Sequence, residues 1–304
     1  MTSPILPTTL IDAPRIAKRL NLKSLTLASE TFQVTGSFKF RAAYTLASSI
    51  ENDLIIAASS GNFGQAVACA CEMLGKHAII VMPETSARVK IDAVRSYGGE
   101  TELIDTSRIT REARVAELAS TNAGGYVASA YDDDYVIAGN ATLAFELARL
   151  TSPVFDAIVA PIGGGGLTSG LISGFASEGC DIPIIAAEPL LANDAAQSIR
   201  AGRIITSDAE SLSMADGART RSVGRRNWAI LQTGLKSIVE VPESAIAQAV
   251  LELYINANLK AEPTGALSLA AILTNPEPFT GQNVCCIVSG GNVDPAVYAK
   301  LILA

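Results

Sequence analysis

A lysine set between two phenylalanines is the first side chain whose position suggests chemistry. Residues 35–43 read TGSFKFRAA, and the apolar spacing that follows predicts a helix that Thr35 or Ser37 can cap. Lys39 then lies in the first helical turn, where the helix dipole disfavours a cation, and its aromatic neighbours would shield it from water. Three interpretations follow: the side chain reaches out to water, its amine is kept neutral for covalent chemistry, or it faces an anion.

A run of four glycines offers an anion site. Residues 163–166 read GGGG between an expected buried strand and an expected helix. Backbone N–H groups can converge in such a loop, and the helix N-terminus adds positive potential, so a phosphate fits. The run lacks the Gly-Lys-Ser/Thr of nucleoside-triphosphate loops and breaks the G-x-G-x-x-G spacing of dinucleotide folds. A phosphate site without nucleotide motifs, together with a shielded lysine, indicates a phosphorylated aldehyde, namely pyridoxal phosphate.

The composition excludes several other classes of function. A net charge of −7 without any basic run argues against a nucleic-acid partner, and no apolar run is long enough to cross a membrane. His77 is the only histidine, which excludes a histidine triad or a site with several histidine ligands. The cysteines lack C-x-x-C spacing and are expected to be reduced core residues in a cytoplasmic protein: Cys69, Cys71, Cys180, Cys285 and Cys286.

Buried strands alternate with helices along most of the chain. The expected strands cover residues 54–59, 77–83, 100–105, 125–129, 156–162, 182–189, 237–242 and 283–291. The expected helices cover residues 64–74, 87–97, 111–120, 135–150, 167–179, 243–260 and 264–273, with a more polar stretch at 192–236. Arg88 and Lys90 are interpreted as an ordinary solvated helix face. This alternation predicts an α/β fold whose mostly parallel sheet is covered on both faces, with ligands at the carboxyl ends of its strands.

Seven motifs occur in an order typical of one family. They are TGSFKFR, SSGNFGQA, GGGGLTSG, EPLLAND, MADGAR with a following SVG, EPTGA and SGGN, and they span almost the whole chain. In these motifs the sequence resembles the serine/threonine dehydratase and serine racemase family, pyridoxal-phosphate enzymes of the tryptophan-synthase β-like fold (fold type II). The resemblance implies a large cofactor-binding domain over 1–53 and 132–304, a small domain over 54–131, and the cofactor in the cleft between them. It leaves no segment for the C-terminal regulatory domain of long threonine dehydratases, so we expect no feedback control of that kind.

The resemblance also implies a role for each matching residue. Lys39 would carry the cofactor as a Schiff base and then take the α-proton of the substrate as general base. Asn62 would bind the 3′-oxygen of the cofactor and Ser289 would face its ring nitrogen. The backbone residues implied for the cofactor phosphate are Gly163, Gly164, Gly165, Gly166 and Leu167. The residues implied for the substrate are Ser59, Ser60, Gly61, Asn62 and Gln65, with Arg111 as a second anchor for the carboxylate.

The implied activity is that of a dehydratase. Such an ammonia-lyase converts a β-hydroxy amino acid such as serine, threonine or 3-hydroxyaspartate into a 2-keto acid and ammonia. The alternative is an amino-acid racemase of the serine or aspartate type, or an enzyme with both activities. Racemisation needs a second proton carrier on the opposite face of the substrate, and in the racemase branch that carrier matches Ser60.

Three rivals are disfavoured. Cysteine synthases and threonine synthases of the same fold usually have aspartate where Phe40 stands, and cysteine synthases carry TSGNTG in place of SSGNFG. A cofactor-free binding or regulatory relative would not need an intact Lys39 and an intact glycine run. The family usually has histidine where Phe63 stands and glycine where Ala42 stands. Because Phe63 removes a polar group beside the substrate, side chains other than those of serine and threonine stay open.

A metal ion and a second copy of the chain are also implied. In metal-dependent members of the family, the positions that match Glu188, the carbonyl of Ala192 and Asp194 bind the ion. Hard oxygen ligands suit Mg²⁺ or Ca²⁺ completed by waters, although an acidic turn after a strand would explain the same residues. The implied partners are a small amino-acid substrate and a second subunit in a homodimer.

Overall fold

The structure, a computed structural model, describes residues 3–59, 61–86, 88–150, 154–208 and 211–303. Its strands are β1 (Thr9–Asp12), β2 (Ser24–Ser29), β3 (Leu54–Ala58), β4 (His77–Pro83), β5 (Glu100–Ile104), β6 (Tyr126–Ala128), β7 (Ala157–Pro161), β8 (Ile184–Pro189), β9 (Ser237–Val241) and β10 (Asn283–Val288). Its α-helices are α1 (Pro14–Arg19), α2 (Lys39–Ser49), α3 (Asn62–Leu74), α4 (Arg88–Ser96), α5 (Arg111–Thr121), α6 (Asp134–Ala148), α7 (Gly166–Ser177), α8 (Asp194–Ala201), α9 (Arg225–Gly234), α10 (Glu243–Ala257), α11 (Pro263–Thr274) and α12 (Pro295–Leu303). Short 3-10 helices are η1 (Leu190–Ala192), η2 (Asp216–Ala218) and η3 (Glu277–Phe279).

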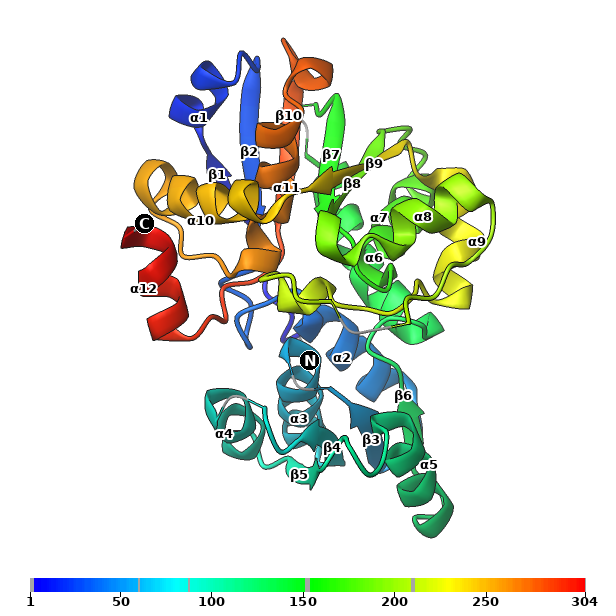
Figure 1. Cartoon of the computed structure of the whole chain (residues 1–304). Coiled ribbons are helices and arrows are strands. Elements are labelled where there is room, and N and C mark those ends of the chain that lie inside the picture. The colour runs from blue at the N-terminus through cyan, green and yellow to red at the C-terminus, as the bar shows by residue number, and fades with distance from the viewer. Residues whose placement is uncertain (1–2, 60, 87, 151–153, 209–210, 304) are drawn as a thin grey trace.

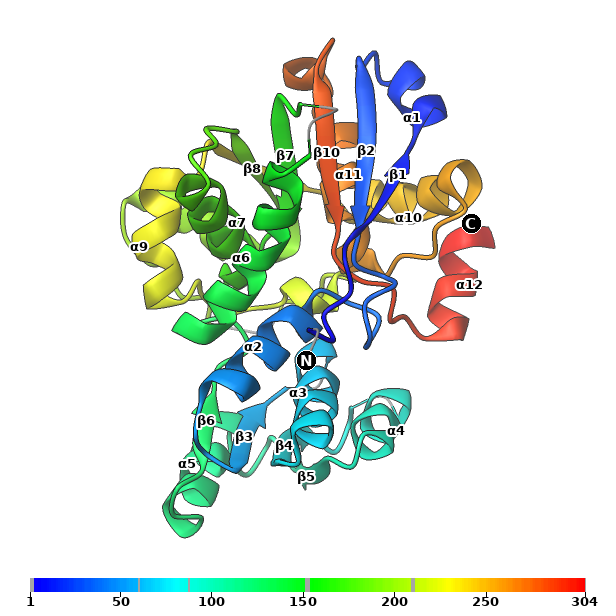
Figure 2. The ribbon, with the colours of Figure 1, turned by 180° about the vertical axis from the view of Figure 1, so that it is seen from behind.

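A six-stranded sheet forms the larger lobe (Figure 1). Its strand order is β1-β2-β10-β7-β8-β9, and all neighbours are parallel except β1, which pairs antiparallel with β2 at one edge. Figures 1 and 2 show α10 and α11 on one face and α6 and α7 on the other. A separate cluster of buried apolar side chains lies under each of these layers. The central strands β7 and β10 are almost wholly apolar and buried because both faces of the sheet are covered there, as the sequence predicts, whereas the edge strands β1 and β9 carry polar residues such as Asp12 and Glu240.

A four-stranded parallel sheet forms the smaller lobe (Figure 1). Its strand order is β5-β4-β3-β6. Helices α2 and α3 share a buried cluster with one face, and the side chains of α5 pack on the other. Because α2 packs against both α3 and α6, it joins the two lobes. In the described part of the chain, no helix is long and apolar enough to cross a membrane.

Two helices lie in the polar stretch 192–236. The carboxylate of Glu188 accepts two backbone N–H groups in the first turn of α8, both at 2.8 Å. The carboxylate of Asp132 accepts the first two N–H groups of α9, at 3.2 and 2.9 Å. Each helix is therefore capped by an acid outside the helix itself, and the one that caps α9 is more than 90 residues away in the chain.

Helix α2 begins at Lys39, and the predicted side-chain cap is wrong. The N-cap residue is Phe38, whose side chain makes no capping hydrogen bond. The hydroxyls of Thr35 and Ser37 are buried and have no hydrogen-bond partner among the described residues. The backbone N–H of Phe38 instead donates to the carbonyl of Ser289 at 3.0 Å. The residue that follows β10 therefore holds the start of this helix.

A buried guanidinium holds the same helical turn. Arg41 is fully buried and donates Nε and Nη2 to the two carboxylate oxygens of Glu30 at 2.7 and 2.9 Å. It also donates Nη1 and Nη2 to Glu146 of α6 at 2.7 and 3.1 Å. Loss of this guanidinium would leave the buried Glu30 unpaired, which costs about 3–5 kcal/mol in comparable sites. The network thus stabilises the turn from which Lys39 extends.

Candidate active site

Residues of both lobes line a cavity of about 420 Å³. The residues that follow β3, β7 and β10 meet the N-termini of α2, α3, α7 and α11 at this cavity. Parallel α/β sheets form their ligand sites at such carboxyl ends. The wall contains the residues that the sequence suggested for a cofactor: Lys39, Asn62, Gly163, Gly164, Gly165, Gly166, Leu167 and Ser289.

The amine of Lys39 is shielded from water. Its Nζ donates to the backbone carbonyl of Ala130 at 2.6 Å and lies 5.0 Å from the ring centroid of Phe38 and 5.6 Å from that of Phe63. Burial lowers the pKa of Lys39 to about 8, although the nearby carboxylate of Glu262 acts in the opposite direction. A larger fraction of this amine is therefore neutral near physiological pH than in an ordinary lysine, which suits reaction with a carbonyl group.

The four glycines form a tightly enclosed loop between β7 and α7. Gly165 has φ +95° at the N-cap of α7, a conformation that favours glycine. A Cβ at Gly164 would lie 2.2 Å from the ring of Tyr131, and one at Gly166 would lie 3.0 Å from the Tyr131 backbone. One side of the loop thus packs closely against the chain, and the other faces the cavity. Backbone N–H groups at the N-terminus of a 12-residue helix can bind an anion there.

Asn62 belongs to a hydrogen-bond network that includes a buried acid. Its Nδ2 donates to Glu262 at 2.7 Å, and its Oδ1 accepts from Gln65 at 3.1 Å and from Asn292 at 2.9 Å. Burial raises the pKa of Glu262 to about 8, and the charge of Asp216 adds to this effect. The sequence included Glu262 in a motif without giving it a role. Its position directly before a proline that opens a helix is the local signal that could have drawn attention to it.

The residues suggested for substrate binding divide into two groups. Gly61, Ser59 and Arg111 line the cavity, the last from the start of α5. The Ser59 hydroxyl also accepts the backbone N–H of Gly61 at 3.3 Å and so supports the loop before α3. Gln65 is not among the described residues that line the cavity and lies behind Asn62. Ser60 lies outside the residues that the structure describes.

Phe63 supplies the second aromatic side chain beside Lys39. It is buried and lines the cavity, consistent with the expectation that an apolar group replaces a polar one there. Phe40, which the sequence placed beside the lysine, is instead fully buried, with its ring centroid 5.8 Å from that of Tyr44. The helical period carries Phe40 away from the cavity because it directly follows Lys39.

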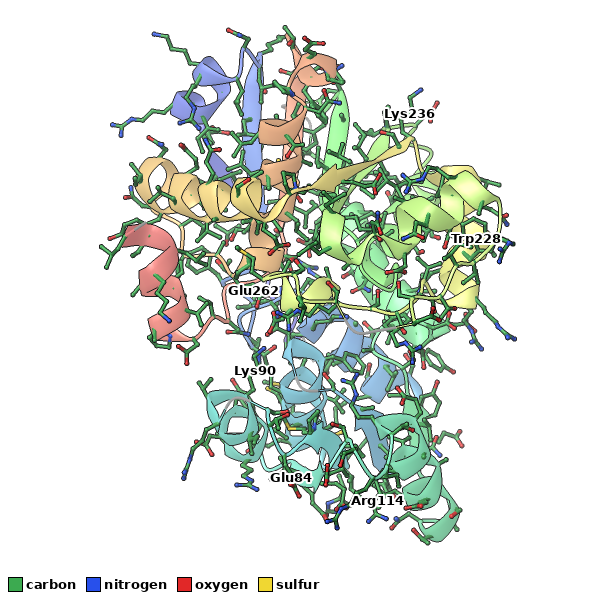
Figure 3. The ribbon with its side chains drawn as sticks, in the orientation of Figure 1. Glu84, Lys90, Arg114, Trp228, Lys236 and Glu262 are labelled. Atoms are coloured by element: carbon green, nitrogen blue, oxygen red, sulfur yellow. The ribbon has the colours of Figure 1, made fainter. Side chains whose placement is uncertain are left out.

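Lys90 is not an ordinary solvated lysine, so that interpretation is wrong. It lines the cavity from α4 of the smaller lobe and forms an ion pair with Asp216 of η2 in the larger lobe. Figure 3 shows Lys90 on the smaller lobe and Glu262 on the larger one. Arg88 is exposed and pairs with Asp92, as expected for a solvated helix face.

Two buried acids mark the suggested metal site. Glu188 and Asp194 are fully buried, and burial raises their pKa values to about 8 and about 7. Both carboxylate oxygens of Asp194 lack a well-aligned hydrogen bond among the described residues, although its own N–H and that of Val223 offset part of the burial. Ala192 is also buried, in η1. In the described part of the chain, no group of three or more His, Cys, Asp or Glu side chains could hold a metal. A buried carboxylate without a well-aligned hydrogen bond among the described residues nevertheless fits a cation completed by a carbonyl and waters.

The sequence missed two further residues at the site. Tyr131 packs on the glycine loop and lines the cavity, and Asn227 contacts the same loop from behind. Neither residue belongs to a chemical motif, and no local signal distinguishes either one. Their importance comes only from the approach of residues that are far apart in the sequence.

The amine of Lys39 and the anion site of the glycine loop lie in one cavity, so together they can hold a phosphorylated carbonyl compound.

Comparison with known proteins leads to the same kind of compound. Residues 1–290 match the family described as pyridoxal-phosphate dependent enzyme. The chain is 34% identical to L-threo-3-hydroxyaspartate ammonia-lyase of Pseudomonas sp over 277 residues, which cover 90% of this chain and 86% of that protein. It is 36% identical to serine racemase of Arabidopsis thaliana over 281 residues, which cover 90% and 84% of the two proteins. The solved structure of the T.th. threonine deaminase has a TM-score of 0.88 at 35% identity, covering 95% of this chain and 94% of that one. The chain therefore belongs to the pyridoxal-phosphate dependent enzyme family, as the order of its motifs predicted.

Proposed function

We propose that this chain is a dehydratase (ammonia-lyase) that converts a β-hydroxy amino acid such as serine, threonine or 3-hydroxyaspartate into a 2-keto acid and ammonia. The observation that carries the proposal is the cavity that holds the shielded amine of Lys39 together with the glycine loop. The named activities of the relatives, an ammonia-lyase of 3-hydroxyaspartate among them, support this class of substrate.

The chain's own residues fit the cofactor. We propose that Lys39 binds its aldehyde carbon, the loop of residues 163–167 its phosphate, Asn62 its 3′-oxygen and Ser289 its ring nitrogen. The loop supports this assignment because it offers backbone N–H groups to an anion and bears no side chain toward it at residues 163–166. A neutral hydroxyl at Ser289 would leave the ring nitrogen largely unprotonated, which favours loss of the β-hydroxyl over transamination.

The substrate carboxylate is proposed to bind at the start of α3. The N-terminal end of this 13-residue helix is suited to an anion. The proposed substrate-binding residues are Ser59, Ser60, Gly61, Asn62 and Gln65, with Arg111 as a second anchor. Because Gln65 lies behind Asn62, its proposed contribution is to orient the Asn62 amide.

Lys39 is the proposed base for the α-proton. Its lowered pKa lets the amine gain and release a proton near neutral pH, and the Ala130 carbonyl orients Nζ. When bound, pyridoxal phosphate supplies a carbonyl that joins an amine and a ring that delocalises the electrons left on the α-carbon. Nζ of Lys39, free once the substrate amine has replaced it, would take the α-proton and could return it to the β-hydroxyl, which would leave as water. The enamine released in this way would gain a proton at its β-carbon, and water would then replace its nitrogen to give the 2-keto acid and ammonia.

Racemisation is the second candidate activity. It is favoured by the relatives named serine racemase, one of which is 36% identical to this chain. We propose that Ser60 would then carry the proton on the face opposite Lys39. Dehydration and racemisation share the removal of the α-proton, so one site can support both.

A divalent cation is proposed at Glu188, Asp194 and the carbonyl of Ala192. Both oxygens of the buried Asp194 carboxylate lack a well-aligned hydrogen bond among the described residues, and this supports the assignment because a cation would satisfy them. Oxygen ligands favour Mg²⁺ or Ca²⁺ over softer metals.

The larger organisation of the protein is also a proposal. We propose a large domain over 1–53 and 132–304, a small domain over 54–131, a homodimer, and a cytoplasmic location. The presence of two separate sheets supports the division, and five free cysteines support a reducing compartment. Limited proteolysis, light scattering after size-exclusion chromatography, and cell fractionation test these three points.

A release assay tests the proposed activity. The holoenzyme is incubated with the L- and D-isomers of serine, threonine and 3-hydroxyaspartate, and keto acid, ammonia and the opposite enantiomer are measured. We expect equal amounts of keto acid and ammonia from at least one β-hydroxy amino acid, and none with Lys39→Ala. Appearance of the opposite enantiomer alone would favour the racemase. No product of either kind from any of these substrates would contradict both activities.

A further inference from the structure

Asn227 lies behind the glycine loop, on the side away from the cavity. It is the third residue of α9 and is fully buried. A Cβ at Gly165 would lie 2.9 Å from the Cβ of Asn227, so the two residues are in close contact. Asn227 is not among the described residues that line the cavity. It can therefore act on a bound molecule only through the backbone segments that it holds in place.

The side-chain amide of Asn227 binds two backbone carbonyls. Its Nδ2 donates to the carbonyl of Gly164 at 2.8 Å and to that of Tyr131 at 2.9 Å. The N–H of Gly224, just before α9, donates to the same Gly164 carbonyl at 3.0 Å. Two donors from one side thus hold this carbonyl toward α9.

The orientation of this amide is determined by its surroundings. Within the described part of the chain, its Oδ1 is buried without a hydrogen-bond partner. A flipped amide would place that oxygen against two carbonyl oxygens and leave the Nδ2 group without acceptors. A buried oxygen without a hydrogen bond costs free energy. The structure therefore keeps the two hydrogen bonds donated by Nδ2 of Asn227, although its Oδ1 goes without one among the described residues.

The direction of the Gly164 carbonyl decides where the next N–H points. In a trans peptide the C=O of one residue and the N–H of the next point in opposite directions. A Gly164 carbonyl held toward α9 therefore directs the N–H of Gly165 away from α9. A carbonyl that turned toward the cavity would instead present lone pairs to an anion and repel it.

We propose that Asn227 is a positioning residue that holds the glycine loop in the conformation that binds the cofactor phosphate. The inference rests on the proposed placement of that phosphate at residues 163–167. Because the same amide also holds the Tyr131 carbonyl, it joins the loop to the segment whose Ala130 carbonyl accepts the Lys39 amine.

Cofactor binding to the purified, cofactor-free protein tests this role. Asn227→Ala removes the hydrogen bonds from Nδ2 to the Gly164 and Tyr131 carbonyls, and Asn227→Asp keeps the shape of the side chain but places oxygens against the two carbonyls. Asn140→Ala is the matched control, because Asn140 is an equally buried asparagine in α6 whose side-chain atoms have no hydrogen-bond partner among the described residues. Dissociation constants are measured by absorbance for pyridoxal phosphate and for pyridoxal, which lacks the phosphate. Thermal unfolding of each cofactor-free variant checks its fold.

We expect both Asn227 variants to bind pyridoxal phosphate roughly tenfold more weakly, because each loses two buried hydrogen bonds. Binding of pyridoxal should change less than about twofold, and Asn140→Ala should leave both constants near those of the wild type. If the affinities for pyridoxal phosphate and for pyridoxal fall equally, Asn227 has only a general structural role. If the ratio of the two dissociation constants stays that of the wild type with neither affinity lowered, the inference is overturned. If the wild type itself binds pyridoxal phosphate no better than pyridoxal, the proposed phosphate site fails instead. Should one variant not fold, the other decides between these outcomes by the same ratio.

Discussion

Replacement of Gly164 by alanine tests the geometry of the glycine loop. Gly164 is not among the glycines with positive φ, so its backbone conformation accepts an alanine. The obstacle is the ring of Tyr131, whose nearest atoms would lie 2.2, 2.3 and 2.6 Å from the new Cβ. Either the loop or the ring must therefore move by more than about 1 Å to reach ordinary contact.

A shift of that size is enough to break hydrogen bonds from the loop to a phosphate. Hydrogen bonds weaken steeply once the two heavy atoms separate beyond their normal range. One bond to a charged group contributes about 1.5–3 kcal/mol, so loss of one corresponds to roughly 10- to 150-fold weaker binding of pyridoxal phosphate. Stability should fall less, because Tyr131 lies at the edge of a cavity into which it can move.

The assay is an absorbance titration of cofactor-free protein with pyridoxal phosphate. Gly164→Ala is compared with the wild type, and the double variant Gly164→Ala/Tyr131→Ala is compared with Tyr131→Ala alone. Without the Tyr131 ring, the extra methyl group should lower the affinity for pyridoxal phosphate less than about threefold. The effects of the two substitutions would then be strongly non-additive, as expected for residues in direct contact. Binding of Gly164→Ala within about threefold of the wild type would refute the steric reasoning. An equal loss with and without the Tyr131 ring would refute it as well.

Three further predictions concern the metal, the second proton carrier and the lysine. A chelator should lower the melting temperature of the wild type, and added Mg²⁺ or Ca²⁺ should restore it. Asp194→Asn should abolish both responses. If the melting temperature of the wild type responds neither to the chelator nor to the ions, these acids only cap a helix. Ser60→Ala should suppress interconversion of enantiomers and elimination from the D-isomer but largely spare elimination from the L-isomer, and equal loss of all these activities would make Ser60 a binding residue. Because burial lowers the pKa of Lys39, its neutral fraction in cofactor-free protein should rise as pH increases, with a midpoint at about 8. Mass spectrometry can follow the acylation rate of Lys39 against pH, and a midpoint near the ordinary value of 10.5 would contradict the burial.

The order of strands and helices was largely predictable because its signals are local. The apolar run at 77–83 became β4 (His77–Pro83) with the same bounds, and the helix expected at 111–120 became α5 with one residue more. Both segments carry their own periodicity and end signals. Helix α9 was missed because the acid that caps it, Asp132, lies 94 residues away in the chain, whereas α8 was missed although Asn193 and Asp194 stand at its start.

The same distinction explains what the sequence could say about the site. Lys39 was recognisable because its unfavourable position in a helical turn is visible in nine residues of sequence. Tyr131 and Asn227 were not, since each acts by a contact with a residue far away in the chain. Glu262 stood in a motif before a helix-opening proline, but its role depends on its distant contact with Asn62. Lys90 was misjudged for this reason: its ion-pair partner Asp216 lies 126 residues further along.

Chemical trapping of the cofactor tests the central claim most directly. The holoenzyme is treated with borohydride, digested, and analysed by mass spectrometry for peptides that carry the reduced cofactor. The cavity geometry predicts one modified site, Lys39, and loss of both the fixed cofactor and the visible absorption in a folded Lys39→Ala variant. Cofactor fixed to any other lysine of the wild type, or retained by Lys39→Ala after reduction, would contradict the assignment of the cavity.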